Sequence, residues 1–337
     1  MDNAIEQFQK VVIRHPKFEE VVRRMDQNFT CAQQAFDPAP LAVIGESRTG
    51  KTQAIDTFVS KHPKQRLDNG MNVPVVLVTA PSRPTVKGLA ELILENLGDP
   101  DPDHGTENAR TRRLKVLMKA AQTRMLIIDE FQHFYDKGTK AVIHHVTDWL
   151  KILVDDLRCA LVVAGLPSCK AVIDQNEQLA GRFQAPVHLS RFQWTKLDER
   201  EDFKGILYGF DEELREARFQ IPELYQEGMA YRFWTATGGL IGYLTKFLRK
   251  AVVNAVDRKT DVINLEDLRI AHQEAMWDEP GGDTGLSPFD RKFRLELNTD
   301  IVQHALQIGT VKIPIESTPR TNNRLKQKSG SACLTRN

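Results

Sequence analysis

The chain has 337 residues, 41% of them apolar and 27% charged, which is the composition of a soluble globular protein with room for two or three compact units. It contains no apolar run near the roughly 20 residues that a membrane-spanning helix needs, and its polar first residues do not resemble a secretory signal. We therefore expect a cytoplasmic protein with no membrane partner. Neither a CxxC pair nor metal-ligand spacing occurs, which favours reduced thiols at Cys31, Cys159, Cys169 and Cys333.

The formal net charge of +1 neither requires nor excludes a nucleic-acid partner, but two stretches of the chain are locally basic. One lies between residues 110 and 124, and the other follows Gly309. Their cations are Arg110, Arg112, Arg113, Lys115, Lys119 and Arg124 in the first, and Lys312, Arg320, Arg324, Lys326, Lys328 and Arg336 in the second. Each stretch is either a surface for an anionic partner or a solvated face.

The N-terminal segment, residues 1–38, has the apolar spacing of helices, and Pro16 suits the first turn of the second one. An α/β pattern follows over residues 39–194. Continuous apolar runs predict buried strands at 41–44, 73–80, 125–129, 159–164 and 186–189. Helices are predicted between them at 51–60, 85–97, 107–121 and 141–155, and short helices are predicted after the turn at Gly165-Leu-Pro167. Buried strands that alternate with helices are typical of a parallel sheet with helices on both faces.

Beyond residue 194 the pattern is helical only. Helices are predicted near 197–217, 222–235, 239–257 and 264–275, which makes residues 195–278 a small all-helical domain. Residues 279–337 are polar and basic, and we expect a partly disordered tail there.

The strongest motif follows the first predicted strand and matches the phosphate-binding pattern G-x4-G-K-[ST]. The glycines let backbone N–H groups close around a phosphate, and the start of the following helix adds its positive end. Lys51 is expected to reach the β- and γ-phosphates of ATP, and Thr52 to bind Mg²⁺. The alternative is a chance glycine-rich turn. We expect contacts to ATP from Gly45, Glu46, Ser47, Arg48, Thr49, Gly50, Lys51 and Thr52.

A pair of acids, Asp129 and Glu130, ends the predicted strand at 125–129. A carboxylate at the tip of a parallel strand beside the phosphate loop can hold the magnesium ion, which is the role expected of Asp129. The adjacent acid can orient the attacking water, which is the role expected of Glu130. Taken alone, such a pair is often only a strand end; the phosphate loop upstream favours the catalytic interpretation. Gln132 and His133 follow and are candidates to contact the water or the partner subunit, with a structural role favoured for the histidine.

Arg182 lies in the string Gly181-Arg-Phe183, just before the last predicted strand. An arginine here can reach the γ-phosphate held by a neighbouring subunit and stabilise the charge that develops on transfer. The alternative is an ordinary surface arginine in a salt bridge. The strand at 159–164 ends in apolar residues where many such ATPases place a polar sensor, so Gly165 or residues near Ser168 would have to substitute.

The combination of the phosphate loop with the strings IIDEFQHF, VVAGLP and QLAGRF and a helical lid resembles the AAA+ ATPases. More narrowly it resembles the TniB/TnsC family of transposition regulators, and within it the TnsC members from CRISPR-associated transposons. The likeness spans about residues 10–275 and includes Arg14-His-Pro-Lys-Phe18 and Thr237-Gly-Gly-Leu-Ile-Gly242. It implies an α/β AAA+ P-loop domain with an N-terminal helical segment and a small helical lid.

The resemblance also implies a function. ATP-bound subunits would assemble with Mg²⁺ into rings or filaments on double-stranded DNA, and hydrolysis would disassemble them. A TniQ-type protein would supply the target signal, and the transposase TnsB, with TnsA where present, would be recruited. By position, Lys51, Thr52, Asp129 and Glu130 match the family's nucleotide motifs, and Arg182 matches the arginine finger.

Two further groups of residues follow from the resemblance. In the lid Gly242 precedes Tyr243 where many AAA+ proteins carry an arginine, so Lys246 and Arg249 are the available cations. The channel loops that grip DNA in this family fall between the second strand and the Asp-Glu strand. This places candidate DNA contacts at Lys87, Thr106, Arg110 and Arg113, with solvated helix faces as the alternative.

Two other functions compete with this interpretation. A helicase loader or replication initiator would carry a DNA-reading module after the lid, and residues 279–337 look too polar for one. A signalling NTPase would switch conformation with nucleotide but would not bind duplex DNA in an ATP-dependent way.

Overall fold

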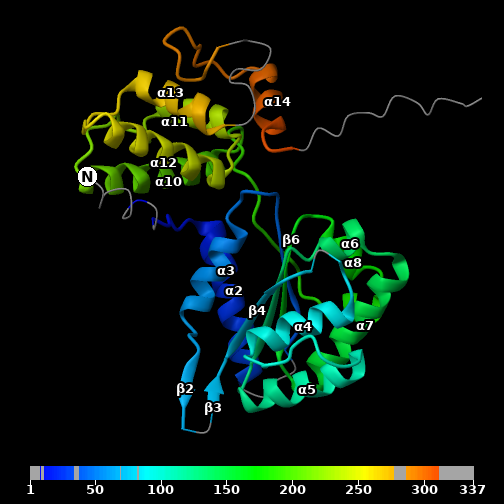
Figure 1. Ribbon diagram of the computed structural model, residues 1–337. Coiled ribbons are helices and arrows are strands. Elements are labelled where there is room, and N and C mark those ends of the chain that lie inside the picture. The colour runs from blue at the N-terminus through cyan, green and yellow to red at the C-terminus, as the bar shows by residue number, and fades with distance from the viewer. Residues whose placement is uncertain are drawn as a thin grey trace, which may run out of the picture.

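A computed structural model of the chain describes residue 8 and residues 11–33, 38–68, 70–81, 83–276 and 286–310. Its centre is a five-stranded sheet in the order β4-β5-β6-β1-β7, in which every paired strand is parallel (Figure 1). The strands are β1 (Leu41–Ile44), β4 (Val75–Thr79), β5 (Met125–Asp129), β6 (Ala160–Gly165) and β7 (Val187–His188). The predicted parallel sheet is confirmed, with each strand at the predicted place along the chain.

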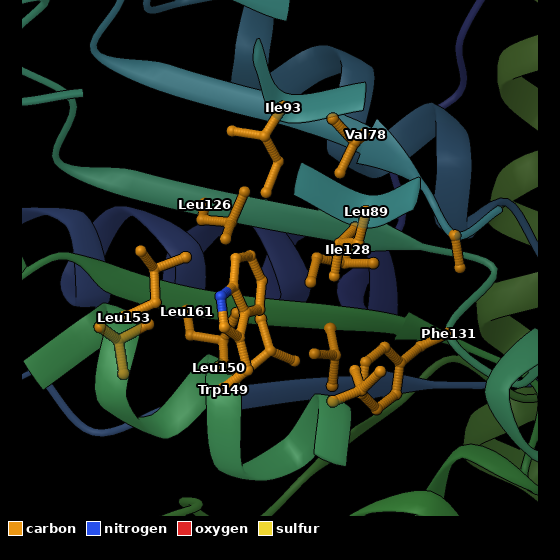
Figure 2. Packing of buried hydrophobic residues seen from close by; sticks show 14 of the residues in the cluster. Val78, Leu89, Ile93, Leu126, Ile128, Phe131, Trp149, Leu150, Leu153 and Leu161 are labelled. Carbon is orange, nitrogen blue, oxygen red and sulfur yellow. The ribbon is translucent and has the colours of Figure 1, made fainter. Parts of the chain in front are cut away.

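Both faces of the sheet are covered by helices because successive strand residues point to opposite sides. On one face, the apolar side chains pack with α2 (Pro16–Gln33) and α3 (Lys51–Ser60). On the other face they pack mainly with α4 (Val86–Asn96), α5 (Glu107–Ala120) and α7 (Lys140–Leu157). Figure 2 shows this second layer, with strand side chains between those of α4 and α7. Each Leu or Ile buried there contributes about 1.5–3 kcal/mol.

Three short helices lie in the segments that follow β5 and β6. Those beyond Pro167 were predicted, whereas the one after β5 was not predicted as a separate element. They are α6 (His133–Lys137), α8 (Cys169–Ile173) and α9 (Glu177–Ala180). The helix α6 follows β5 directly, and α8 and α9 follow β6. Residues from the ends of both strands are therefore brought into the same region.

An antiparallel hairpin of β2 (Gln65–Leu67) and β3 (Gly70–Asn72) was also not predicted. It projects from the α/β domain between α3 and β4 (Figure 1). Gly70 has φ 137°, a backbone conformation that suits glycine in a tight turn. The hairpin is too short and polar to show a strand pattern in the sequence.

The lid consists of α10 (Leu197–Glu216), α11 (Glu227–Thr237), α12 (Ile241–Asp257) and α13 (Leu265–Ala275), as predicted to within a few residues. Its core is rich in aromatic residues, including Phe203, Trp234 and Phe247.

The expected polar tail from residue 279 is wrong for residues 286–310, which pack on the lid. Phe289, Ile301 and Ala305 belong to the lid's core, and the helix α14 (Thr299–Gln307) lies against α11. The side chain of Asn298 caps α14 by accepting a hydrogen bond from the N–H of Ile301. The basic residues after position 310 lie outside the described residues. No helix in the part of the chain that the structure describes is long and apolar enough to span a membrane.

Candidate nucleotide-binding site

The phosphate-binding loop lies between the end of β1 and the start of α3, at the carboxyl edge of the parallel sheet. The N–H of Gly45 donates to the carbonyl of Gly165 over 3.1 Å, which ties the loop to the end of β6. A Cβ atom on Gly45 would fall 2.1 Å from the carbonyl oxygen of Leu189, so only glycine fits. Gly50 and Arg48 have positive φ angles of 96° and 66°, which curl the loop ahead of the helix.

The side chain of Lys51 folds into this loop and is only 7% exposed. Its ammonium group donates to the carbonyl oxygens of Gly45 and Glu46 over 2.9 and 2.7 Å. Burial lowers the pKa of Lys51, while the negative charges of Asp129 and Glu130 oppose that shift. The ammonium group is thus held at the mouth of the loop by acceptors that a phosphate could replace.

Thr52 of α3 and Asp129 of β5 meet at the sheet edge, although β6 lies between β5 and β1, the strand that leads into the phosphate loop. The hydroxyl of Thr52 donates to Oδ2 of Asp129 over 2.9 Å, and Asp129 is only 6% exposed. No group of three or more His, Cys, Asp or Glu side chains in the described ranges could hold a metal ion. A hydroxyl and one carboxylate are nevertheless the protein ligands that suit Mg²⁺, which keeps its other positions for water and phosphate oxygens. The donor set therefore fits a nucleotide-bound Mg²⁺.

Glu130 lies just beyond β5 in a left-handed backbone conformation, with φ 54°. Its N–H donates to Oδ1 of Asp129 over 2.8 Å, so the two acids are fixed relative to each other. The amide of Gln132 donates from Nε2 to Oε2 of Glu130, and its Oε1 accepts from the N–H of Leu166 over 3.0 Å. Nothing in the sequence pattern indicated this bridge between the ends of β5 and β6.

His133 turns away from the acids. Its Nδ1 lies 3.1 Å from the carbonyl oxygen of Ala80, at the end of β4. This contact supports the structural role favoured from the sequence.

A cavity of about 370 Å³ opens beside the phosphate loop, between the segment before α2 and the lid helix α12. The loop and the lid touch there: the N–H of Gly242 donates to the carbonyl of Arg48 over 2.8 Å, and a Cβ at Gly242 would come within 2.9 Å of that oxygen. Burial lowers the pKa of His15, on the cavity wall, to about 4, so this imidazole is neutral at physiological pH. The walls include Val11, Val12, Ile13, His15, Thr49, Ile241, Lys246 and Arg249. Both candidate lid cations thus line the cavity.

Arg191, which the sequence analysis did not single out, joins the loop to the lid. It is 5% exposed, and its Nε donates to Oε2 of Glu46 over 2.7 Å. Its other nitrogens donate to the carbonyls of Gly238, Ala305 and Ile308, at the ends of α11 and α14. A cation at two helix carboxyl ends is electrostatically favourable. The string Ser190-Arg-Phe192 carries no signal by which it could have been found.

Arg182 lies apart from the loop of its own chain. It follows α9 and forms an ion pair with Asp155 of α7, and both side chains are more than a third exposed, at 38% and 37%. A partly exposed Arg182 on the outer face is compatible both with an arginine finger and with an ordinary surface arginine in a salt bridge.

The four candidate DNA contacts have different surroundings. Lys87 and Thr106 are exposed, in the first turn of α4 and at the start of α5. Arg113 is partly exposed and binds Asp99 as well as the carbonyl of Asp101 over 2.7 Å.

Arg110 does not fit the expectation of a phosphate contact at the surface. Its side chain is only 2% exposed and forms an ion pair with Glu91 of α4 over 2.6 Å. Arg110 precedes the buried Leu114 and Met118 by one and two helical turns, so it lies on the inner face of α5.

Comparisons with known proteins show which folds resemble that of this chain. No protein of curated function matches the sequence. Among solved structures, the Orc1 protein of Aeropyrum pernix in complex with DNA superposes with a TM-score of 0.55 and 16% identity, covering 78% of this chain and 66% of that one. Cdc6p of Pyrobaculum aerophilum gives a TM-score of 0.58 at 15% identity, covering 81% of this chain and 71% of that one. The ORC2 protein of Aeropyrum pernix, in its ADPNP-ADP complexes, gives 0.58 at 15% identity, covering 81% and 72%.

At these identities the likeness concerns the fold, and it confirms the expected AAA+ P-loop domain with a helical lid. This chain spans about two thirds to three quarters of the length of those proteins. The family described as bacterial TniB protein matches residues 5–194, more than half of the chain and all of the α/β domain. The chain therefore belongs to the TniB family and has the AAA+ P-loop fold.

Proposed function

We propose that this protein is an ATP-dependent regulator of DNA transposition that assembles on double-stranded DNA and is released by ATP hydrolysis. The observation that carries the proposal is the convergence of Lys51, Thr52, Asp129 and Glu130 at one edge of the sheet in a TniB-family chain. The partners follow from the family: the transposase TnsB, with TnsA where present, and a TniQ-type target selector. The DNA in the Orc1 complex belongs to that protein and supplies only a precedent for the fold.

Nucleotide binding would use the loop and the cavity together. Lys51 exchanges its two carbonyl acceptors for phosphate oxygens, and the loop N–H groups and the start of α3 supply further donors. The cavity of about 370 Å³ between residues 11–15 and α12 lies where the base and ribose can be held. Lys246 and Arg249 place positive charge on the lid side of the phosphates.

Hydrolysis would use the acids. Thr52 and Asp129 are the residues that would hold a nucleotide-bound Mg²⁺, which would supply charge neutralisation at the phosphates. Glu130 orients the attacking water and accepts its proton. Arg182 reaches the γ-phosphate of the neighbouring subunit, which makes assembly a condition of rapid hydrolysis.

DNA binding would use Lys87, Thr106 and Arg113, and we leave out Arg110 because its guanidinium is buried against Glu91. Contacts of this kind go to phosphates, so binding should depend steeply on salt and weakly on sequence.

The experiment that tests the proposal is electron microscopy of the protein with duplex DNA, Mg²⁺ and either ATP or ADP. Rings or filaments on DNA with ATP, and few with ADP, are the expected result. ATP hydrolysis without assembly or DNA binding would favour a signalling NTPase instead.

A matched pair of variants tests the DNA surface. We expect Lys87→Glu to weaken duplex binding about tenfold and to reduce the salt dependence by roughly one ion, measured by fluorescence anisotropy between low and moderate salt. Lys170→Glu, at an exposed position on the short helix α8, is the control. Equal affinity of both variants would place the DNA elsewhere.

A further inference from the structure

The end of β6 lacks a polar side chain where it borders the catalytic acids. Val163, Ala164 and Gly165 are buried and offer no side-chain hydrogen-bonding group. Glu130 lies close by, because the N–H of Phe131 donates to the carbonyl of Ala164 over 2.9 Å. An apolar strand end leaves the carboxylate of Glu130 without a partner from β6.

The side chain of Gln132 fills this place. It is 3% exposed, and its Oε1 accepts hydrogen bonds from the N–H of Leu166 at 3.0 Å and the thiol of Cys169 at 3.7 Å. A Cβ at Gly165 would fall 2.1 Å from that oxygen. A side chain at position 165 would therefore displace the amide of Gln132 from the place that it occupies here.

The direction of the amide is determined by its surroundings. Leu166 can only donate through its N–H, so the oxygen of Gln132 must face it. The NH₂ group is then left facing Oε2 of Glu130, which as a carboxylate can only accept. A flipped amide would oppose donor to donor on one side and acceptor to acceptor on the other.

We propose that Gln132 is the positioning residue for hydrolysis. Its amide NH₂ holds Oε2 of Glu130 and joins Glu130 to the end of β6, which leaves Oε1 of Glu130 for the attacking water. This inference rests on the ATPase activity proposed above. The backbone of Glu130 is held by the bond from its N–H to Asp129 and by the bond from the N–H of His133 to its carbonyl, so Gln132 adds the restraint on the side chain. A carboxylate fixed at one oxygen presents the other in a defined direction, which proton abstraction requires.

Gln132→Glu is the sharpest test because it keeps the length of the side chain and the oxygen that accepts from Leu166. Once ionised, the new carboxylate cannot donate to Glu130. At pH 8, with saturating DNA and Mg²⁺, we expect kcat to fall about 10- to 100-fold, as for other residues that orient a catalytic group. Affinity for a fluorescent ATP analogue should change less than about twofold, since the phosphate loop is untouched.

The pH dependence separates positioning from a structural role. The introduced carboxyl would face Glu130, Asp129 and the thiol of Cys169, and it would also face the ammonium of Lys51. Two neighbouring carboxyls share a proton at the lower pH, and the shared proton restores a donor to Glu130. The ratio of variant to wild-type kcat should therefore rise as the pH is lowered from 8 to 6. A ratio independent of pH would overturn the proposal.

Gln132→Met gives a second, independent test of the role of Gln132. It fills the same space without hydrogen bonds, so kcat should be low at every pH, and the amide of Leu166 should exchange its hydrogen faster in the nucleotide-free chain. In Gln132→Glu that amide should stay protected. The control is Gln273→Ala on the exposed face of α13, which should match wild type in every assay.

The outcomes distinguish this inference from the function on which it rests. A wild-type chain without ATP hydrolysis would remove the proposed function itself. Wild-type hydrolysis together with an unchanged kcat in Gln132→Glu at pH 8, or with equal losses of kcat and ATP affinity, would remove only the role of Gln132.

Discussion

The phosphate loop and the Arg182 segment are the two halves of the proposed catalytic site, and they are built in opposite ways. Lys51 and Asp129 are buried, at 7% and 6% exposure, and each is held by hydrogen bonds within the chain. Arg182 lies on the surface, and its ion pair with Asp155 is more than a third exposed. A buried network holds one geometry, whereas an exposed pair costs little to exchange. Under the proposed function, folding alone assembles the loop, whereas Arg182 would enter a site only through contact with a second copy.

Lys51→Ala should have the largest effect, because it removes the buried ammonium group of the phosphate loop. Loss of the ammonium group should lower kcat/KM by about 10³-fold and abolish ATP-dependent assembly on DNA, since phosphate binding and its charge stabilisation both fail. Phosphate release and sedimentation measure the two effects. The control is Lys61→Ala at the other end of the same helix, where the ammonium pairs with Asp26 at the surface. Normal assembly by Lys51→Ala would show that assembly does not depend on the phosphate loop.

Arg182→Ala should cost almost as much in hydrolysis but nothing in binding. A finger supplied by a neighbour contributes about 10³-fold or more to the rate, while each chain still holds its own nucleotide. An equal mixture of Lys51→Ala and Arg182→Ala chains should recover activity, because the first donates a finger to the second's intact loop. If the mixture is no more active than its parts, Arg182 is an ordinary surface arginine.

The buried half was also the half that the sequence predicted best. The loop and the acid pair are local patterns whose chemistry fixes their spacing, so Lys51 and Glu130 could be assigned before any contact was known. The strands were found because each is a continuous apolar run.

What the sequence did not predict depends on contacts between distant residues. Gln132 reaches Leu166 across 34 positions, and Arg191 reaches Ile308 across 117. The helix α14 was missed because only Ile301 and Ala305 are buried in it, which is too few to set a period. Arg110 was assigned to a surface from its basic neighbours, although its spacing from Leu114 already placed it on the inner face.

Glu130→Gln should have an intermediate effect, and it separates hydrolysis from ATP binding at the buried phosphate site. The amide keeps the size of the side chain but cannot take a proton from water, so kcat should fall about 10²-fold while ATP affinity is retained. Assemblies on DNA should then persist after free ATP is removed, which a dissociation time course measures. A variant that hydrolyses ATP at the wild-type rate would take Glu130 out of the mechanism.

Asp155→Asn should have the smallest effect, because it removes one exposed ion pair of Arg182. An ion pair with both side chains more than a third exposed contributes at most about 1 kcal/mol, so the free energy of unfolding should change by less than that. Freed from Asp155, Arg182 should engage the neighbouring subunit at a lower protein concentration, and the concentration that gives half-maximal ATPase activity should fall about twofold to fivefold. Asp174→Asn, which breaks the more exposed surface pair with Lys170, is the control and should not shift that concentration. A large loss of stability in Asp155→Asn, or a rise in the half-maximal concentration, would mean that the pair holds the finger in its working position. The surface half of the site would then be built in the same way as the buried half.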